Sequence, residues 1–178
     1  MSPPGRSLPR RMLRAVTLEA DFYEEVEAEP RSIRQATVVV LLAASAGALG
    51  SALAGWPALR VVLDLVEPLV LWLGGSLFAY MVGATFFRGP ETETDYAEVL
   101  RTTGFAFAPG LLRVFAFLPP VDRVGFSITV IADLWVLAAG VVAVRQALDF
   151  TTLRAIGTFG TAYALLWLVL GGALFALP

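Results

Sequence analysis

The chain has 178 residues, of which 57% are hydrophobic and only 16% are charged, and its formal net charge is −2. A soluble domain of this length could not bury so much apolar surface, so the composition excludes an ordinary water-soluble protein and predicts an integral membrane protein. The sequence contains no cysteine and no histidine, which excludes thiol nucleophiles, imidazole bases, disulfides and the usual zinc and haem ligands, so we expect no cofactor and no metal site.

Residues 1–32 form a polar N-terminal segment in two parts. Residues 1–8 are rich in Pro, Gly, Ser and Arg, and this composition predicts disorder. Residues 9–29 carry apolar side chains at helical spacing, with arginines first and carboxylates later, which predicts an amphipathic helix ended by Pro30. This helix either lies in the membrane interface, with its arginines among anionic headgroups, or packs as a solvated helix against its own protein.

Residues 33–178 form the membrane domain, in which apolar blocks alternate with short charged turns. An α-helix needs about 20 apolar residues to cross a hydrocarbon core of about 30 Å. Five blocks reach or approach that length: 36–54, 61–87, 103–118, 124–144 and 155–176. The predicted fold class is therefore an all-α integral membrane bundle of five transmembrane helices, with the amphipathic helix on the cytoplasmic side.

The arginines are distributed unevenly between the two faces of such a bundle. With five spans, one face receives the N-terminus and the turns around residues 88–101 and 145–154. That face holds ten arginines: Arg6, Arg10, Arg11, Arg14, Arg31, Arg34, Arg88, Arg101, Arg145 and Arg154. Because basic residues near spans stay in the cytoplasm, we expect a cytoplasmic N-terminus, an external C-terminus and a location in the cytoplasmic membrane.

The third block contains Gly104, Pro109 and Gly110, which together predict a break in its helix. Proline removes one backbone hydrogen bond and clashes with the preceding turn. A freed carbonyl within a membrane must be buried in protein or face water. The break therefore indicates either a broken helix that lines a transport site or a kink that serves packing alone.

Four charged residues fall within the blocks. Arg113 and Asp133 lie at similar depths on the third and fourth blocks, about 18 Å from their cytoplasmic ends at about 1.5 Å per residue. We predict that they form an intramembrane pair, because an isolated charge is costly there; the alternative is that Arg113 extends to the outer surface near Asp122. Asp64 and Glu67 are interpreted as carboxylates at the wet outer end of the second span, and not as ion ligands.

Small residues recur at helical spacing, as in Ala43 with Gly47 and in the Gly74-Gly75 pair. They allow helices to approach closely, either inside the bundle or between copies of the chain. The sequence is therefore compatible with an oligomer.

Three stretches carry a resemblance to a known family. Residues 94–109 read TDYAEVLRTTGFAFAP, with a tyrosine, a Leu-Arg pair, a Gly-aromatic pair and a proline at the start of the third span. The second stretch consists of Trp135, AVRQAL at 143–148 and TTLRAI at 151–156. The third is FYEE at 22–25 through Pro30, followed by RQA at 34–36. From Phe22 onward the chain resembles the prokaryotic branch of the Yip family of five-span membrane proteins, named for interaction with Ypt/Rab GTPases.

The resemblance implies a cytoplasmic N-terminus and an external C-terminus, in agreement with the arginine distribution. Eukaryotic members bind prenylated GTPases, but residues 1–32 do not resemble their long acidic, proline-rich cytoplasmic domain, so we do not carry GTPase binding over to this chain. We expect a non-enzymatic scaffold or adaptor that presents a cytoplasmic surface to a protein partner or organises the lipid bilayer, and we expect no nucleic-acid partner. The candidate surface residues are Tyr23, Tyr96, Arg101, Arg145 and Arg154.

Two other functions are considered. The chain could be a transporter or channel component that uses the break at Pro109 and the Arg113–Asp133 pair. It would then contain a water-filled cavity beside Pro109 that reaches the middle of the membrane. A membrane enzyme ranks below both, because the spans contain no GxSxG motif and no clustered carboxylates.

Overall fold

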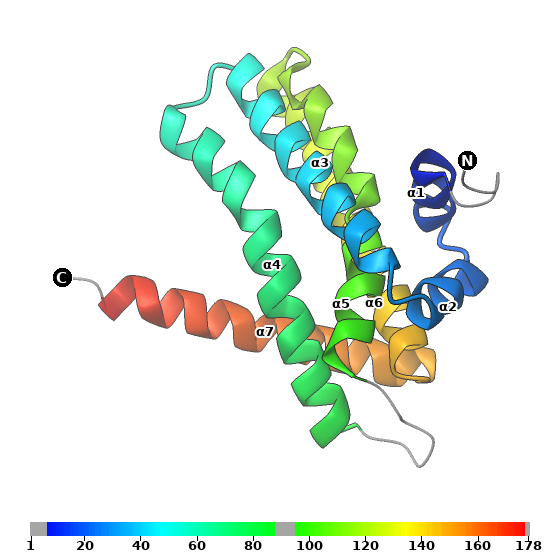
Figure 1. Cartoon of the computed structure of the whole chain (residues 1–178). Coiled ribbons are helices and arrows are strands. Elements are labelled where there is room, and N and C mark those ends of the chain that lie inside the picture. Colours follow the sequence, from blue (N-terminus) through cyan, green and yellow to red (C-terminus); the bar gives the residue numbers. More distant parts are fainter. Residues whose placement is uncertain (1–6, 88–94, 177–178) are drawn as a thin grey trace.

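The computed structural model describes residues 7–87 and 95–176, with side chains described as far as Val169. Residues 1–6, which make up most of the stretch expected to be disordered, lie outside the described residues. Within the described ranges, all regular secondary structure is helical (Figure 1). This confirms the all-α class.

The N-terminal segment contains two short helices, α1 (Leu8–Val16) and α2 (Ala20–Ala28). This differs from the single helix expected over residues 9–29. Leu18, between the two, has a φ of 59°, a left-handed conformation that an α-helix of L-residues cannot continue through. The turn at Leu18 separates α1 from α2, and both helices lie along one side of the bundle (Figure 1).

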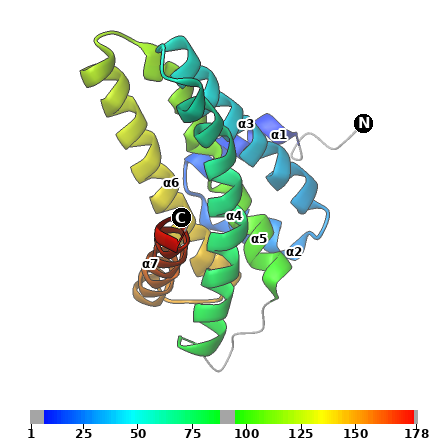
Figure 2. The ribbon, with the colours of Figure 1, turned by 90° about the vertical axis from the view of Figure 1, so that its left-hand side faces the viewer.

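Four helices are long and apolar enough to cross a membrane, among the residues that the structure describes. They are α3 (Ser32–Leu53), α4 (Ala58–Thr85), α6 (Phe126–Ala147) and α7 (Thr152–Ala176). Helices α3 and α4 form an antiparallel hairpin. Helix α7 crosses the bundle at a steep angle, and its C-terminal end projects away from the other helices (Figure 1). Figure 2 shows α7 nearly end-on.

The third apolar block is not one continuous helix. Its chain enters through α5 (Tyr96–Phe105), which begins with a capping box between Asp95 and Glu98, and continues in η1 (Ala108–Phe117), a 3₁₀ helix. Pro109 lies in the first turn of η1, where its missing N–H is tolerated. A π-helical turn, η2 (Val121–Gly125), then leads into α6. The expected block 103–118 therefore spans the end of α5 and all of η1.

Helix α3 packs along both α5 and η1, and glycines make this close contact possible. A Cβ on Gly50 of α3 would collide with the backbone carbonyl of Arg113 in η1. A Cβ on Gly104 of α5 would lie 2.8 Å from the Cβ of Ala36. These small residues hold the break inside the bundle, where Ala108, Pro109 and Gly110 are all buried.

Candidate functional sites: the docked N-terminal segment and a charged cavity

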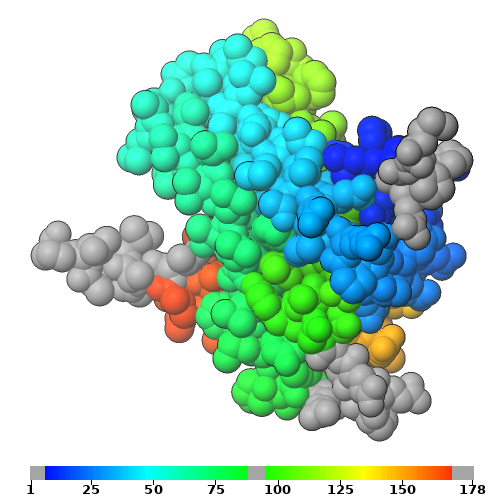
Figure 3. Space-filling view, viewed as in Figure 1, coloured from blue at the N-terminus to red at the C-terminus, as the bar shows by residue number. Residues whose placement is uncertain are grey.

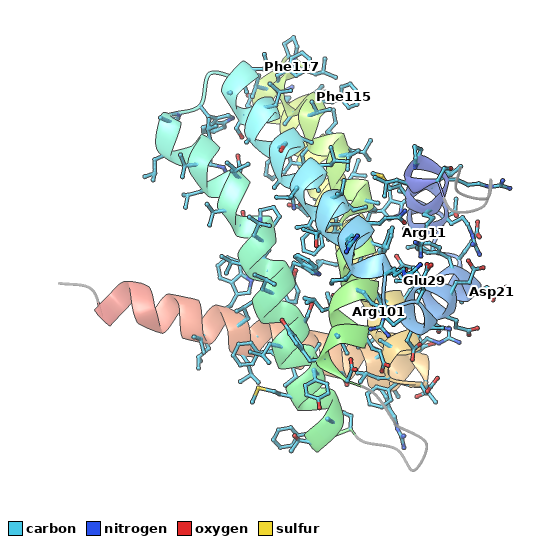
Figure 4. The ribbon with its side chains drawn as sticks, in the orientation of Figure 1. Arg11, Asp21, Glu29, Arg101, Phe115 and Phe117 are labelled. Carbon is cyan, nitrogen blue, oxygen red and sulfur yellow. The ribbon has the colours of Figure 1, made fainter. Side chains whose placement is uncertain are left out.

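Arg11 anchors the N-terminal segment to the bundle. Its side chain is only 6% exposed and donates hydrogen bonds to Oε1 of Gln35 (2.6 Å) and Oγ of Ser32 (2.8 Å) at the start of α3. A carboxylate oxygen of Glu29 lies 3.4 Å from Nη1. Figure 4 shows Arg11 and Glu29 meeting between the N-terminal helices and the start of α3. The guanidinium also lies 5.0 Å from the centre of the Phe105 ring, a cation–π contact.

Arg101 of α5 provides a second anchor, at the C-terminal end of α2. Its Nε donates to the backbone carbonyls of Val26 (3.2 Å) and Glu27 (2.7 Å), and its Nη2 also donates to Glu27. The last carbonyls of a helix lack intrahelical partners, so a buried arginine here satisfies them and complements the negative end of the helix dipole.

Two residues of α6 complete the docking. Gln146 donates a hydrogen bond of 2.7 Å to a carboxylate oxygen of Glu24 in α2. The indole N–H of Trp135 donates to the carbonyl of Val16, the last residue of α1, at 2.9 Å. Phe22 and Tyr23 are fully buried beneath this arrangement. The N-terminal helices are therefore an integral layer on the bundle, and Figure 3 shows them in contact with the first turns of α3.

Glu27 lies where this layer meets the bundle, and burial raises its pKa from the ordinary 4.5 to about 7. The nearby carboxylates of Asp149, Glu98 and Glu24 add to that effect, and Arg101 opposes it. Glu25, on the outer side of α2, shows the opposite behaviour, because its hydrogen bonds with Arg14 lower its pKa.

This raised pKa predicts a pH dependence of docking. The docked segment holds the Glu27 proton more tightly than the released segment, so the stability of docking should fall as the pH rises from about 4.5 to about 7. We expect thermal unfolding in detergent to show this slope between pH 5 and 7.5, and Glu27→Gln to reduce it. Glu25→Gln is the matched control, since the lowered pKa of Glu25 places its contribution below that range. An unchanged slope in Glu27→Gln would contradict the assignment.

The second candidate site is a charged cavity of about 140 Å³ at the opposite end of the bundle, where α3 turns into α4. The structure brings Arg113 and Asp133 together here: Nε and Nη2 of Arg113 donate to Oδ1 of Asp133 at 2.8 and 2.5 Å. Asp64 is buried in the same cavity. It accepts a hydrogen bond from the hydroxyl of Ser51 and forms an ion pair with Arg60, in which Nη2 lies 2.8 Å from Oδ1. Asp64 is thus a paired internal carboxylate and not the wet helix-end group that was expected.

The predicted helix break lies apart from this cavity. Gly104, Pro109 and Gly110 are buried against neighbouring helices, and Pro109 borders an apolar groove that also includes Leu13 and Trp135. The cavity lined by Arg113 and Asp133 does not include any of the three break residues. The two features on which a transport site was predicted to rest are therefore not brought together.

The five candidate surface residues divide into two groups. Tyr23 and Arg101 are buried and hold the N-terminal layer in place, so neither is available to a partner in this structure. Tyr96 is half-buried, and its hydroxyl donates to the carbonyl of Leu73 at 3.1 Å. Arg145 and Arg154 are exposed.

The sequence reasoning missed the anchoring role of Arg11 and the pairing of Asp64. A hint was available for Arg11, because it lies on the same helical face as Met12 and Ala15, which are also directed toward the bundle. Among the described residues, no group of three or more acidic side chains is placed to hold a metal ion.

Helices of membrane-spanning length, together with a charged cavity between them, define a helical integral membrane protein. A family model described as the Yip1 domain matches residues 13–175, so the chain belongs to the Yip family. This confirms the resemblance to the Yip family seen in the sequence. Comparison with curated proteins and comparison with solved structures gave no match.

Proposed function

We propose that this Yip-family protein is a non-enzymatic membrane scaffold or adaptor whose N-terminal layer presents a binding surface in the cytoplasm. The observation that carries the proposal is the docking of α1 and α2 by buried arginines. This docking joins segments distant in the sequence into one surface. Gln146 couples α2 to the end of α6, so the exposed Glu24 of α2 lies next to the turn that carries Arg145.

The proposal includes five crossings with the N-terminus inside. The composite of α5 and η1 supports the third crossing, because 3₁₀ helices rise about 2.0 Å per residue and α-helices about 1.5 Å. Ten residues of each therefore extend over roughly 35 Å, enough for a hydrocarbon core of about 30 Å. The uneven distribution of arginines supports the orientation and placement in the cytoplasmic membrane.

The surface beside the N-terminal layer offers both charge signs and one apolar side chain. Asp21 and Glu24 of α2 are exposed, as are Arg145 and Arg154 at the turn between α6 and α7. Leu153, next to Arg154, is 80% exposed. An exposed leucine between charges is a typical composition for a protein–protein contact, in which an apolar centre excludes water and charges set specificity.

The test is charge reversal at this surface. We expect Arg145→Glu combined with Arg154→Glu to reduce recovery of cross-linked protein partners from native membranes by about tenfold, because losing central interface contacts commonly costs that much. Quantitative mass spectrometry of the purified protein is the measurement. Arg123→Glu, an exposed arginine at the opposite end of the bundle, is the matched control. Equal partner recovery from the double variant and the control would contradict the proposed surface.

A further inference from the structure

The exposed apolar side chains of the bundle do not reach the same depth on all sides. Helices α3 and α4 form a hairpin, so Leu53 at the end of α3 and Leu59 at the start of α4 mark one shared end. On α4 the large exposed apolar side chains continue from Leu59 to Met81, about 33 Å at about 1.5 Å per residue. On α3 they continue from Leu53 only to Val38, about 22 Å. The exposed apolar surface of α3 is therefore about a third shorter.

Two elements next to the N-terminal layer agree with α3. The side chains of residues 99 and 101–105 of α5 are buried, and α2 packs against this helix. The part of the third crossing that can contact lipid is thus η1, about 20 Å long at about 2.0 Å per residue. On α6 the large exposed apolar side chains run from Phe126 to Leu137, about 16 Å. A hydrocarbon core is about 30 Å thick, so α4 matches it and these three elements are shorter.

Basic side chains mark the end of the short apolar surface of α3. Arg34 precedes Val38 by one helical turn, Arg31 lies just before α3, and Arg10 lies on α1; all three are exposed. None of their side chains has an ion pair or hydrogen bond with a residue that the structure describes. Unpaired arginines at the edge of an apolar surface are typical of the level of lipid phosphates.

Helix α1 has the features of a helix that lies in a membrane interface. Its apolar side chains, Met12 and Leu13 among them, line a groove of about 360 Å³ together with η1 and Trp135 of α6. The hydrogen bond from Trp135 to the carbonyl of Val16 places α1 about 18 Å along α6 from the end at Ala147. That position is near the middle of α6. In a bilayer of even thickness, this level would belong to acyl chains and not to a helix with three arginines.

Tilting the protein does not even out the two apolar heights. The surfaces of α3 and α4 both begin at the shared end, and the boundaries of a flat bilayer are parallel. A flat bilayer that covers the apolar surface of α4 would therefore also cover Arg34. An arginine in hydrocarbon is costly, whereas thinning a bilayer costs little per ångström. The favoured arrangement is a bilayer that is thinner beside α3 than beside α4.

We propose that the protein deforms the bilayer: it holds the lipid thin along the face formed by α1, α3 and η1, and at ordinary thickness along α4. On this thin face, α1 lies among the headgroups of one leaflet, with Arg10 at the phosphates and the groove on the acyl chains. The partner of the thin face is thus a lipid surface of locally reduced thickness. This activity goes beyond the adaptor role, because it requires no protein partner.

Single spin labels test this difference, since the chain contains no cysteine. Nitroxides are attached to Val38→Cys and Leu73→Cys in the purified full chain, in vesicles of dioleoyl phosphatidylcholine. The two positions lie about 22 and 21 Å from the shared end and are 41% and 48% exposed. We expect the ratio of oxygen to nickel-chelate collision rates to be several-fold higher at Leu73, because only that position lies deep in hydrocarbon.

Leu49→Cys and Leu63→Cys are the matched controls. Each lies four residues from the shared end and is 51% exposed, so their ratios should be equal. Equal ratios at Val38 and Leu73 would mean a bilayer of even thickness and would overturn the proposal. A label at Val38 that is shielded from both reagents would show that protein, such as a second copy, covers the thin face, and would equally overturn it.

A second comparison uses the wild-type chain and no variant. Hydrogen exchange is measured in vesicles of dimyristoleoyl or dierucoyl phosphatidylcholine, which form thin and thick bilayers. We expect the amides of α1 and α2 to exchange several-fold faster in the thick bilayer, because a thick leaflet surrounds this layer with hydrocarbon and favours its release. The amides of α4 should change little. Equal exchange of α1 and α2 in the two lipids would contradict the thin face and leave the proposed partner surface untouched.

Discussion

Replacing Arg11 by methionine is expected to release the N-terminal helices from the bundle. Methionine keeps much of the apolar volume but removes the hydrogen bonds to Ser32 and Gln35 and the ion pair with Glu29. Breaking a buried charge pair costs about 3–5 kcal/mol. Glu29 is 27% exposed and can regain water, so we expect about 3 kcal/mol, at the lower end of that range.

Hydrogen exchange measured by mass spectrometry checks this expectation. The amides of α1 and α2 should exchange as freely as those of an undocked peptide, while the protection of α3 and α4 should change little. Arg14→Met is the matched control, three residues further along the same helix. The ion pairs of Arg14 with Glu19 and Glu25 lie at the surface, and such pairs contribute about 1 kcal/mol or less. Equal protection in both variants would show that Arg11 is not the anchor.

Replacing either Arg113 or Asp133 by leucine is expected to destabilise the protein more than replacing both. Each single change leaves one member of the pair without its partner, whereas the double change removes both charges of the pair. Asp133 is 45% exposed and Arg113 18%, so water reduces the penalty, and we expect about 2 kcal/mol for each single variant. The double variant should cost less than either single variant.

A double-mutant cycle of unfolding in mixed micelles measures the coupling between the two residues. We expect a coupling of about 1–3 kcal/mol for this pair. The exposed pair Arg14–Glu25 supplies a control cycle, with an expected coupling below about 1 kcal/mol. A double Leu variant as unstable as the single variants would mean that the two charges are stabilised independently, by water or by other groups.

The docked layer shows why the single helix expected over residues 9–29 is two helices in the structure. The apolar positions do face a hydrophobic surface, and Phe22, Tyr23 and Val26 are fully buried. However, the turn at Leu18 divides the segment, and local periodicity carries no signal for a single left-handed residue. Arg11 then enters the core, because Ser32, Gln35 and Glu29 together replace its hydration.

The charged cavity also shows which features sequence separation predicts and which it does not. Equal depth along two helices suggested the pairing of Arg113 with Asp133, since a straight helix converts sequence separation into height. The same reasoning placed Asp64 and Glu67 near one end of α4, but it could not show which side of the helix faces the bundle. That depends on how α3, α4, η1 and α6 pack, and the close approach at Gly50 sets the position of Arg113.

The sequence by itself determined that this is a membrane protein, that it is helical and that it belongs to the Yip family. Hydropathy, span length and family motifs can each be seen in short stretches of the sequence. Only the tertiary structure decided which polar residues are internal. Arg101 and Glu27 are 74 residues apart in the chain, and Arg113 and Asp133 meet from different helices. Such contacts arise when helices pack, since burial makes an unpaired charge costly and thereby selects its partner. The tertiary structure thus placed two of the five candidate surface residues, Tyr23 and Arg101, inside the protein.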